Sequence, residues 1–329
     1  MLTISNSDAA RLGLLIMYAW DMCDQDSRPD CVVVDERIAI DGYDVIGLFV
    51  GADDIITSGP QGIRQNRVAA GSLNDLRRYG YAARKRNTEE YIAVIRGTDG
   101  AQEWFDDFVF ISTKHPPWPG RVESGFVDIY QSMQYVPLDA GGTATDLAAG
   151  LVQMIQAAGP GASLRVLGHS LGASLAAYLT YDLSTILGKD RVSALLFACP
   201  KSGDHGFVEG FGNAVGEYLV INYELDLVPQ VPKFDILHFD LFRALPDCLM
   251  ITNDTAQASL RTNLACFHHL ISYIALLCPQ EFNRAQPSFV NDNTKCATCV
   301  QSLVGQEPTV QVVVMQSPGI TATGGTVAG

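Results

Sequence analysis

Apolar and polar positions alternate along the chain in blocks that predict strands and helices in turn. Apolar runs of strand length lie at residues 45–50, 164–167, 195–197 and 218–223. Two more runs, 78–83 and 91–95, flank a polar turn and predict a β-hairpin. Apolar residues recur at helical spacing over residues 12–20, 146–155 and 269–277. Alternating strands and helices predict an α/β fold in which helices cover both faces of a mostly parallel central sheet.

The same pattern predicts one core domain with an extension at each end. Residues 1–77 are expected to add a helix and a strand that pack on the core, which spans residues 78–280. Residues 281–329 are expected to form a partly disordered C-terminal tail with an edge strand at 308–316. No Lys or Arg follows Lys295, which fits a tail of this kind.

The apolar stretch 12–20 has the length of a targeting segment, but its surroundings argue against one. Arg11 and Asp21 bracket it, and no small-residue cleavage site follows. We therefore expect an amphipathic helix, and no segment is long and apolar enough to span a bilayer. Without an evident signal peptide, a cytoplasmic location is the default expectation, and signal-independent secretion is the alternative.

The most informative motif is Gly168-His169-Ser170-Leu171-Gly172, which follows an apolar run and precedes a helix of small residues. In this context it predicts a nucleophile elbow, a turn so tight that a Cβ at either glycine would collide with its neighbours. Ser170 would then present its Oγ at the top of the sheet. The N–H groups at the start of the new helix would face an oxyanion formed there. The alternative is a Gly-rich turn whose serine caps the helix.

A serine hydroxyl needs a histidine to accept its proton and a carboxylate to orient that histidine. Asp226 is the candidate acid, because it follows the strand 218–223 and precedes a loop stiffened by two prolines. Asp204 and Asp235 are its rivals, but neither directly follows such a strand.

Position in the chain selects among the six histidines. His169 lies inside the elbow and cannot reach round to its neighbour as a base. In serine hydrolases with this elbow the acid precedes the base, with a further sheet element between them. That rule excludes His115, His205 and His238. His268 and His269 remain, and the residues alone leave both open.

The formal net charge of −14 at pH 7 disfavours two classes of partner. Nucleic acids and anionic membrane surfaces would both be repelled by it. The charge suits a soluble enzyme that acts on uncharged substrates, without selecting one.

The eight cysteines permit disulfides but do not require them in a chain of this length. Cys296-x-x-Cys299 is a lone pair, with Cys266 and Cys278 as distant partners for a metal site. We expect buried thiols or a local disulfide and no metal. No loop has the spaced acidic ligands of a calcium site.

Besides the elbow, several short motifs follow one another in a fixed order. They are Ile95-Arg96-Gly97-Thr98, Glu103-Trp104-Phe105-Asp106-Asp107-Phe108, Gly125-Phe126 with Tyr130, Ala198-Cys199-Pro200-Lys201-Ser202-Gly203-Asp204, Asp226-Leu227-Val228-Pro229-Gln230-Val231-Pro232 and His268-His269-Leu270-Ile271-Ser272-Tyr273. Together they resemble the motifs of class 3 lipases, the fungal-lipase-like branch of the α/β-hydrolases. The resemblance covers about residues 78–277 and implies an α/β-hydrolase fold.

The resemblance also implies a role for each site residue. It makes Ser170 the nucleophile, Asp226 the orienting acid and His268 the base. His268 is favoured over His269 by its spacing to the following leucine and tyrosine. Thr98 and Leu171 would supply the oxyanion donors.

An aromatic stretch at 102–110 covers the site as a lid or lines the acyl groove in that family. Trp104 and Phe105 are the predicted substrate contacts, and an aromatic core stripe is the alternative. Two positions depart from the family pattern. The family often has a histidine shortly before the Gly-Phe pair, where this chain has Glu123-Ser124-Gly125-Phe126, and Ala198 replaces a glycine. We interpret both departures as packing variation.

The implied activity is serine carboxylic ester hydrolysis through an acyl-enzyme. A triacylglycerol lipase that cleaves neutral glycerides, at a lipid–water interface if a lid exists, is the leading hypothesis. A short-chain carboxylesterase or a phospholipase would share the same catalytic residues. A serine peptidase and a catalytically dead binding module are more distant alternatives. The family's chemistry needs no cofactor, and oligomeric state stays open.

Overall fold

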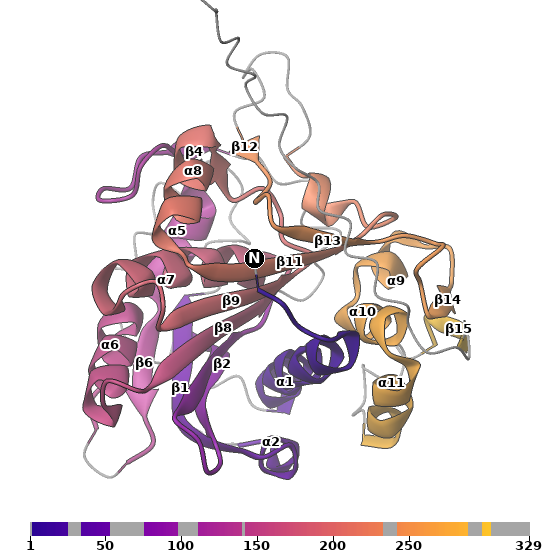
Figure 1. Cartoon of the computed structure of the whole chain (residues 1–329), viewed down its shortest axis with the longest axis horizontal. Helices are drawn as coiled ribbons and strands as arrows, with labels where there is room; N and C mark the ends of the chain where they lie inside the picture. The colour runs from indigo at the N-terminus through magenta and orange to yellow at the C-terminus, as the bar shows by residue number, and fades with distance from the viewer. Residues whose placement is uncertain are drawn as a thin grey trace, which may run out of the picture.

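A computed structural model describes residues 2–25, 34–52, 76–97, 111–139, 142–232, 242–288 and 298–303. Within them, nine strands form one central sheet (Figure 1). In spatial order the strands are β13 (Cys248–Ile251), β11 (Glu217–Tyr223), β9 (Val192–Phe197), β8 (Ser163–His169), β3 (Glu90–Ile95), β2 (Leu76–Lys85), β1 (Tyr43–Ala52), β6 (Gln134–Pro137) and β7 (Thr145–Asp146).

The sheet consists of a parallel half and an antiparallel half. The pairs from β13 through β11, β9 and β8 to β3 are all parallel. The pairs from β3 through β2, β1 and β6 to β7 are all antiparallel. The predicted hairpin is confirmed as β2 and β3, whose tight turn contains Asn87 at φ 61°. The predicted α/β fold is confirmed, but its sheet is mixed rather than mostly parallel; the tight turn between β2 and β3 can join only antiparallel strands.

Helices cover both faces of the sheet, as predicted (Figure 1). On one face lie α1 (Asn6–Gln25), α10 (Leu270–Leu277) and α11 (Pro279–Ala285), and on the other α5 (Ser124–Ser132), α6 (Leu147–Ala158) and α7 (Leu171–Leu187). Successive strand residues point to opposite faces. In β3, Ile92 and Val94 therefore join the core under α1, whereas Ala93 and Ile95 join the core under α7.

The remaining elements are short. They are α2 (Glu36–Ile40), α8 (His205–Ala214), α9 (Leu264–His268), the 3-10 turns η2 (Val228–Gln230) and η3 (Gln286–Ser288), the small sheet β12 (Phe242–Arg243), β10 (Gly203–Asp204), β5 (Val122–Glu123) and β4 (Ser112–Thr113), and the pair β14 (Ala258–Leu260) and β15 (Val300–Leu303). None of the described helices has the length and apolar character needed to cross a membrane.

The N-terminal helix is buried against α10 rather than lying on the surface. Leu14, Ile16 and Met17 are at most 1% exposed. A Cβ added at Gly13 would lie 3.2 Å from the side chain of Ile274, so the two helices approach closely at this glycine. Asp21 pairs with Arg37 of α2, which gives the buried carboxylate its partner.

Part of the predicted C-terminal tail packs on the body. Helix α11 lies within it, and Glu281 accepts from Arg11 of α1 at 2.7 Å. A disulfide joins Cys299 to Cys266 of α9, and β15 pairs with β14. Cys299 thus pairs with a distant cysteine rather than locally. Cys296 and the predicted edge strand 308–316 lie outside the described residues.

Candidate active site

Ser170 occupies a sharp turn between β8 and α7, as the elbow motif predicts. Its backbone angles, φ 59° and ψ −131°, lie in a region that favours glycine, and such angles cost about 1–3 kcal/mol in other residues. A Cβ at Gly168 would lie 2.3 Å from the carbonyl oxygen of Gly172, and one at Gly172 would lie 2.4 Å from that of Arg96. Only glycine at both positions lets strand, turn and helix pack this closely.

Three side chains meet at the turn. Nε2 of His268 lies 2.8 Å from Oγ of Ser170, and its Nδ1 lies 2.9 Å from Oδ2 of Asp226. A carboxylate only accepts hydrogen bonds, so Nδ1 carries the proton and Nε2 is left to accept the serine proton. All three residues are buried, at 1%, 7% and 2% exposure for Ser170, His268 and Asp226. Ser170 is therefore buried, whereas the elbow motif led us to expect an exposed Oγ.

Two further groups fix the carboxylate of Asp226. The backbone N–H of Val228 donates to Oδ1 at 2.9 Å, and the hydroxyl of Tyr273 donates to Oδ2 at 2.7 Å. The Tyr273 oxygen in turn accepts from the backbone N–H of Tyr223, at the end of β11. Each carboxylate oxygen thus has a donor in addition to the histidine. The sequence marked Tyr273 only by its spacing to His268, not by this contact.

The structure separates the two candidate histidines. His268 ends α9 and faces Ser170, whereas His269 begins α10 and accepts the backbone N–H of Ile271 on its Nδ1 at 3.2 Å. Burial lowers the pKa of His269 to about 4, so its ring is neutral and serves as a helix cap. Asn263 caps α9 by accepting from Cys266, whose disulfide also holds this short helix.

One predicted oxyanion donor lies in the described residues. Leu171 is the first residue of α7, where a backbone N–H has no acceptor within the helix. Thr98 lies outside the described residues, as do Trp104 and Phe105. The chain that leads to Thr98 passes the serine, since a Cβ at Gly97 would lie 3.1 Å from Cβ of Ser170.

Sequence reasoning missed the part that Arg96 plays beside this chain. It is 2% exposed, and it donates to the carbonyl oxygens of Arg78 and Gly97, both at 2.6 Å. Its guanidinium lies 4.8 Å from the ring centre of Tyr79 and 5.5 Å from that of Trp20. These contacts hold Gly97, the last described residue before Thr98, in place. The Arg-Gly-Thr motif was the available signal.

Glu123, one of the departures from the family pattern, is a buried acid with a structural task. Its side chain accepts the backbone N–H of Phe126 at 2.7 Å, capping α5, and that of Ile111 at 3.2 Å. Burial raises its pKa to about 7 despite these bonds. The position is therefore more than packing variation.

The rival candidates for the acid and the base either lie away from Ser170 or fall outside the described residues. Asp204 caps α8 by accepting the backbone N–H of Phe207. His205 is exposed, and His115 packs against the ring of Trp118. Asp235 and His238 lie outside the described residues, and within those residues no cluster of potential metal ligands is found.

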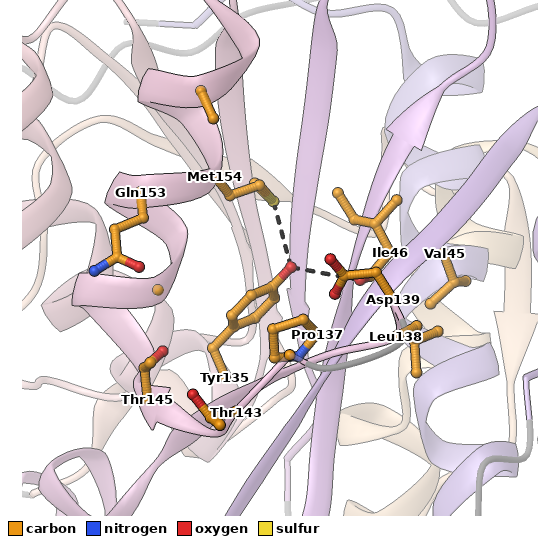
Figure 2. Close-up of a pocket in the computed structure, with 13 residues that line it drawn as sticks. Val45, Ile46, Tyr135, Pro137, Leu138, Asp139, Thr143, Thr145, Gln153 and Met154 are labelled. Atoms are coloured by element: carbon orange, nitrogen blue, oxygen red, sulfur yellow. Dashed lines mark hydrogen bonds between the residues drawn. The ribbon is translucent and has the colours of Figure 1, made fainter.

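An open cavity of about 800 Å³ lies at the antiparallel edge of the sheet, away from these residues (Figure 2). The hydroxyl of Tyr135 points into it and makes only long contacts, 3.4 Å to the carbonyl oxygen of Ile46 and 3.8 Å to the sulfur of Met154. Its lining contains neither a nucleophile beside a base nor a cation. The cavity is therefore no rival to the Ser170 site.

Exposed leucines flank the acid and the helix that carries His268. Leu225 and Leu227 lie on either side of Asp226, and Leu264 begins α9; they are 37%, 37% and 39% exposed. Large apolar side chains in water at a reactive centre are typical of sites that meet apolar ligands.

Comparisons with known proteins agree with this geometry. Residues 92–236 match the family model described as lipase (class 3). The chain is 26% identical to the chloroplastic galactolipase DONGLE of Arabidopsis thaliana over 268 residues, which is 72% of this chain and 55% of that protein. It is 32% identical over 161 residues to phospholipase A1-II 4 of Oryza sativa subsp. japonica, 44% of this chain and 40% of the relative. The chain spans about half the length of the first of these relatives.

A solved structure shares the fold. The triacylglyceride lipase of Rhizomucor miehei superposes with a TM-score of 0.53 at 19% identity, over 75% of this chain and 80% of that one. The predicted α/β-hydrolase fold is confirmed.

Proposed function

We propose that the protein is a serine carboxylic ester hydrolase acting on glycerolipids, starting from the match of residues 92–236 to the class 3 lipase family model. The observation that carries the proposal is the unbroken path of hydrogen bonds from Ser170 through His268 to Asp226. The strained elbow supports it, because such backbone strain gathers at functional sites.

In the proposed reaction His268 removes the proton of Ser170 as Oγ attacks the ester carbonyl carbon. The tetrahedral intermediate collapses, the imidazolium protonates the departing alcohol, and an acyl-serine remains. Water, deprotonated by His268, then attacks the acyl carbon. The second tetrahedral intermediate collapses, the imidazolium returns its proton to Oγ of Ser170, and the carboxylic acid leaves. Asp226 keeps the proton on Nδ1 and stabilises the imidazolium. Hydrogen bonds from Tyr273 and Val228 hold the carboxylate in place for this role.

The carbonyl oxygen becomes negative in each intermediate and needs donors in place. The N–H of Leu171 at the start of α7 is the proposed first donor, and Thr98 the proposed second. Loss of one such donor typically lowers the rate by about 10²–10³-fold. Because Arg96 fixes Gly97, the approach of the chain to Thr98 is set before substrate arrives.

Triacylglycerol is our leading substrate, with cleavage of neutral glycerides at a lipid–water interface. The net charge of −14 opposes anionic lipid surfaces, and the exposed leucines 225, 227 and 264 suit apolar chains. Ser170 is 1% exposed, and we propose that an ester reaches Oγ only in a more open state of the site. We therefore expect a lipid surface to accelerate the reaction.

A second candidate is acyl hydrolysis of polar glycerolipids. It is favoured by the similar proteins found, a galactolipase and a phospholipase A1. A galactolipid headgroup is uncharged and meets no electrostatic penalty here, whereas a phospholipid headgroup carries a phosphate.

The test compares emulsified triacylglycerol, galactolipid and phosphatidylcholine with p-nitrophenyl esters from acetate to palmitate. Ser170→Ala is the control, and a fluorophosphonate probe reports the nucleophile. Ser170-dependent turnover fastest on triacylglycerol supports the leading substrate, and fastest on galactolipid supports the second. Turnover confined to short esters makes the protein a carboxylesterase. Cleavage of amides alone, or no labelling of Ser170, contradicts the proposal.

We further propose that the protein matures in an oxidising compartment rather than in the cytoplasm. The disulfide between Cys266 and Cys299 supports this, since such bonds persist mainly outside reducing compartments. Thiol counting on the natural protein, isolated under alkylating conditions, tests it. Reactive Cys266 and Cys299 in freshly isolated protein would contradict it.

A further inference from the structure

The histidine inside the elbow has no part in the proposed reaction, yet it contacts the base directly. His169 ends β8 and immediately precedes Ser170. It is 4% exposed, and its Nε2 lies 2.9 Å from the backbone carbonyl oxygen of His268. The two imidazole rings lie 4.8 Å apart, tilted by 31°.

The chemistry of this contact fixes the tautomer of His169. A carbonyl oxygen only accepts hydrogen bonds, so Nε2 must carry the proton. Nδ1 is then bare in the neutral ring, and this atom is buried without a hydrogen-bond partner among the described residues. A second proton there would place a charge in a buried site beside His268, His269 and Tyr273. The two facing imidazoles, His169 and His268, thus hold their protons on opposite nitrogens.

Two consecutive elbow residues therefore hold the base at two points. Ser170 contacts the imidazole of His268, and His169 contacts its backbone. The contact from His169 lies at the C-terminal end of a helix, because α9 has five residues and His268 is the last of them. The backbone carbonyl groups in the last turn of a helix receive no hydrogen bond from within the helix. They therefore need a donor from outside it.

We propose that His169 is a positioning residue for the base. As the neutral Nε2–H tautomer it donates to the carbonyl oxygen of His268 and holds the end of α9 in line with Ser170. The inference rests on the proposed function, since it assigns His268 the role of base. A neutral ring also serves the reaction electrostatically, because a charged one would oppose the imidazolium formed 4.8 Å away.

The first test uses wild-type protein labelled with ¹⁵N-histidine, with the signals of His169 identified by their loss in His169→Gln. We expect the shifts of a protonated Nε2 and a bare Nδ1, unchanged from pH 5 to 8. A protonated Nδ1, or titration near the ordinary pKa of histidine, would overturn the proposal. This readout is independent of activity, so it stands apart from any failure of the proposed function.

The second test separates the hydrogen bond from packing. His169→Leu removes the donor, His169→Gln keeps an amide donor within reach, and Leu167→Ala, two residues earlier on β8, removes buried volume without touching His268. With p-nitrophenyl butyrate we expect His169→Leu to lose about 10–100-fold in kcat at an unchanged KM. His169→Gln should stay within about threefold of wild type, since it restores the donor. Leu167→Ala should lower only the melting temperature.

Wild-type kcat in His169→Leu would refute the positioning role, as would an equal loss in folded His169→Gln. If His169→Leu does not fold, the labelled wild-type spectrum and the Gln variant decide. Activity that persists in Ser170→Ala would instead reject the proposed function.

Discussion

The two halves of the central sheet differ in how closely their polar groups are hydrogen-bonded. At the ends of the parallel strands β8 and β11, Ser170, Asp226 and His268 are buried and joined by bonds of 2.8 and 2.9 Å. At the antiparallel edge, Tyr135 makes contacts of 3.4 Å or longer around an open cavity (Figure 2). Parallel strands end together and start helices at one edge, so that edge can gather strained turns and helix N-termini. The antiparallel half supplies stability without a comparable constellation.

The largest expected effect is on activity at the strained turn. Ser170→Ala should lower kcat on p-nitrophenyl butyrate by about 10⁴-fold or more, as loss of a serine nucleophile does elsewhere. Ser170→Gly should be equally inactive but about 1 kcal/mol more stable than Ser170→Ala, because its φ of 59° suits glycine. Kinetics and urea unfolding measure the two effects. Equal stability of the two variants would show that the turn is not strained.

Next in size is the effect of a methyl group at the elbow. In Gly172→Ala the new Cβ would lie 2.4 Å from a backbone oxygen, so we expect a loss of roughly 3 kcal/mol in the free energy of unfolding. Gly161→Ala is the matched control, because nothing lies within 4 Å of its Cβ position. Chemical denaturation of both proteins is the measurement. A similar cost at the two glycines would contradict the close packing described for the elbow.

A third prediction compares one tyrosine from each half of the sheet. Tyr273→Phe removes the donor to Asp226 and should lower kcat about tenfold. Tyr135→Phe removes only the long contacts at the cavity and should leave kcat unchanged, with stability within about 0.5 kcal/mol. Steady-state kinetics and thermal melts decide. If Tyr135→Phe lowers kcat as much as Tyr273→Phe, the two halves are not functionally distinct.

The last prediction, confined to one range of pH, is a pH dependence of stability from Glu123. Its folded pKa of about 7 lies above the usual 4.5, so the native state binds its proton more tightly than the unfolded chain. The stability that the folded protein gains from this tighter proton binding is complete below pH 4.5 and is lost as pH rises to 7. His269 acts in the opposite sense, because burial lowers its pKa to about 4. Its contribution to the stability of the folded protein is lost as pH falls from 6.5 to 4.

Comparing wild type with Glu123→Gln isolates the acid from the histidine. Relative to wild type, the Gln variant should gain stability on the order of 1–3 kcal/mol between pH 4.5 and 7.5. Urea titrations at several pH values measure the difference. A constant difference across that range would show that Glu123 ionises normally.

Local signals in the sequence predicted the elbow, the hairpin and the acid at Asp226. Each depends on neighbours in the chain: a glycine pair around a serine, two apolar runs around a polar turn, an aspartate after a strand. The choice of His268 over His269 came from family spacing, and only the fold shows which ring faces Ser170. The contact of His169 with a backbone 99 residues away could not be read from sequence. Nor could the pairing of Cys266 with Cys299, or the joining of β1, β6 and β7 to the sheet.

The close approach of Gly13 to Ile274 has a consequence for how the chain is made. Helix α1 leaves the ribosome long before α10, against which it packs, because the two helices lie far apart in the chain. Until then the apolar side chains of α1 have no complete partner surface, and they are available to chaperones or to other nascent chains. Long-range closure of this kind slows folding and exposes intermediates to aggregation. Helix α1 is thus translated early but can complete its packing only after α10 has been made.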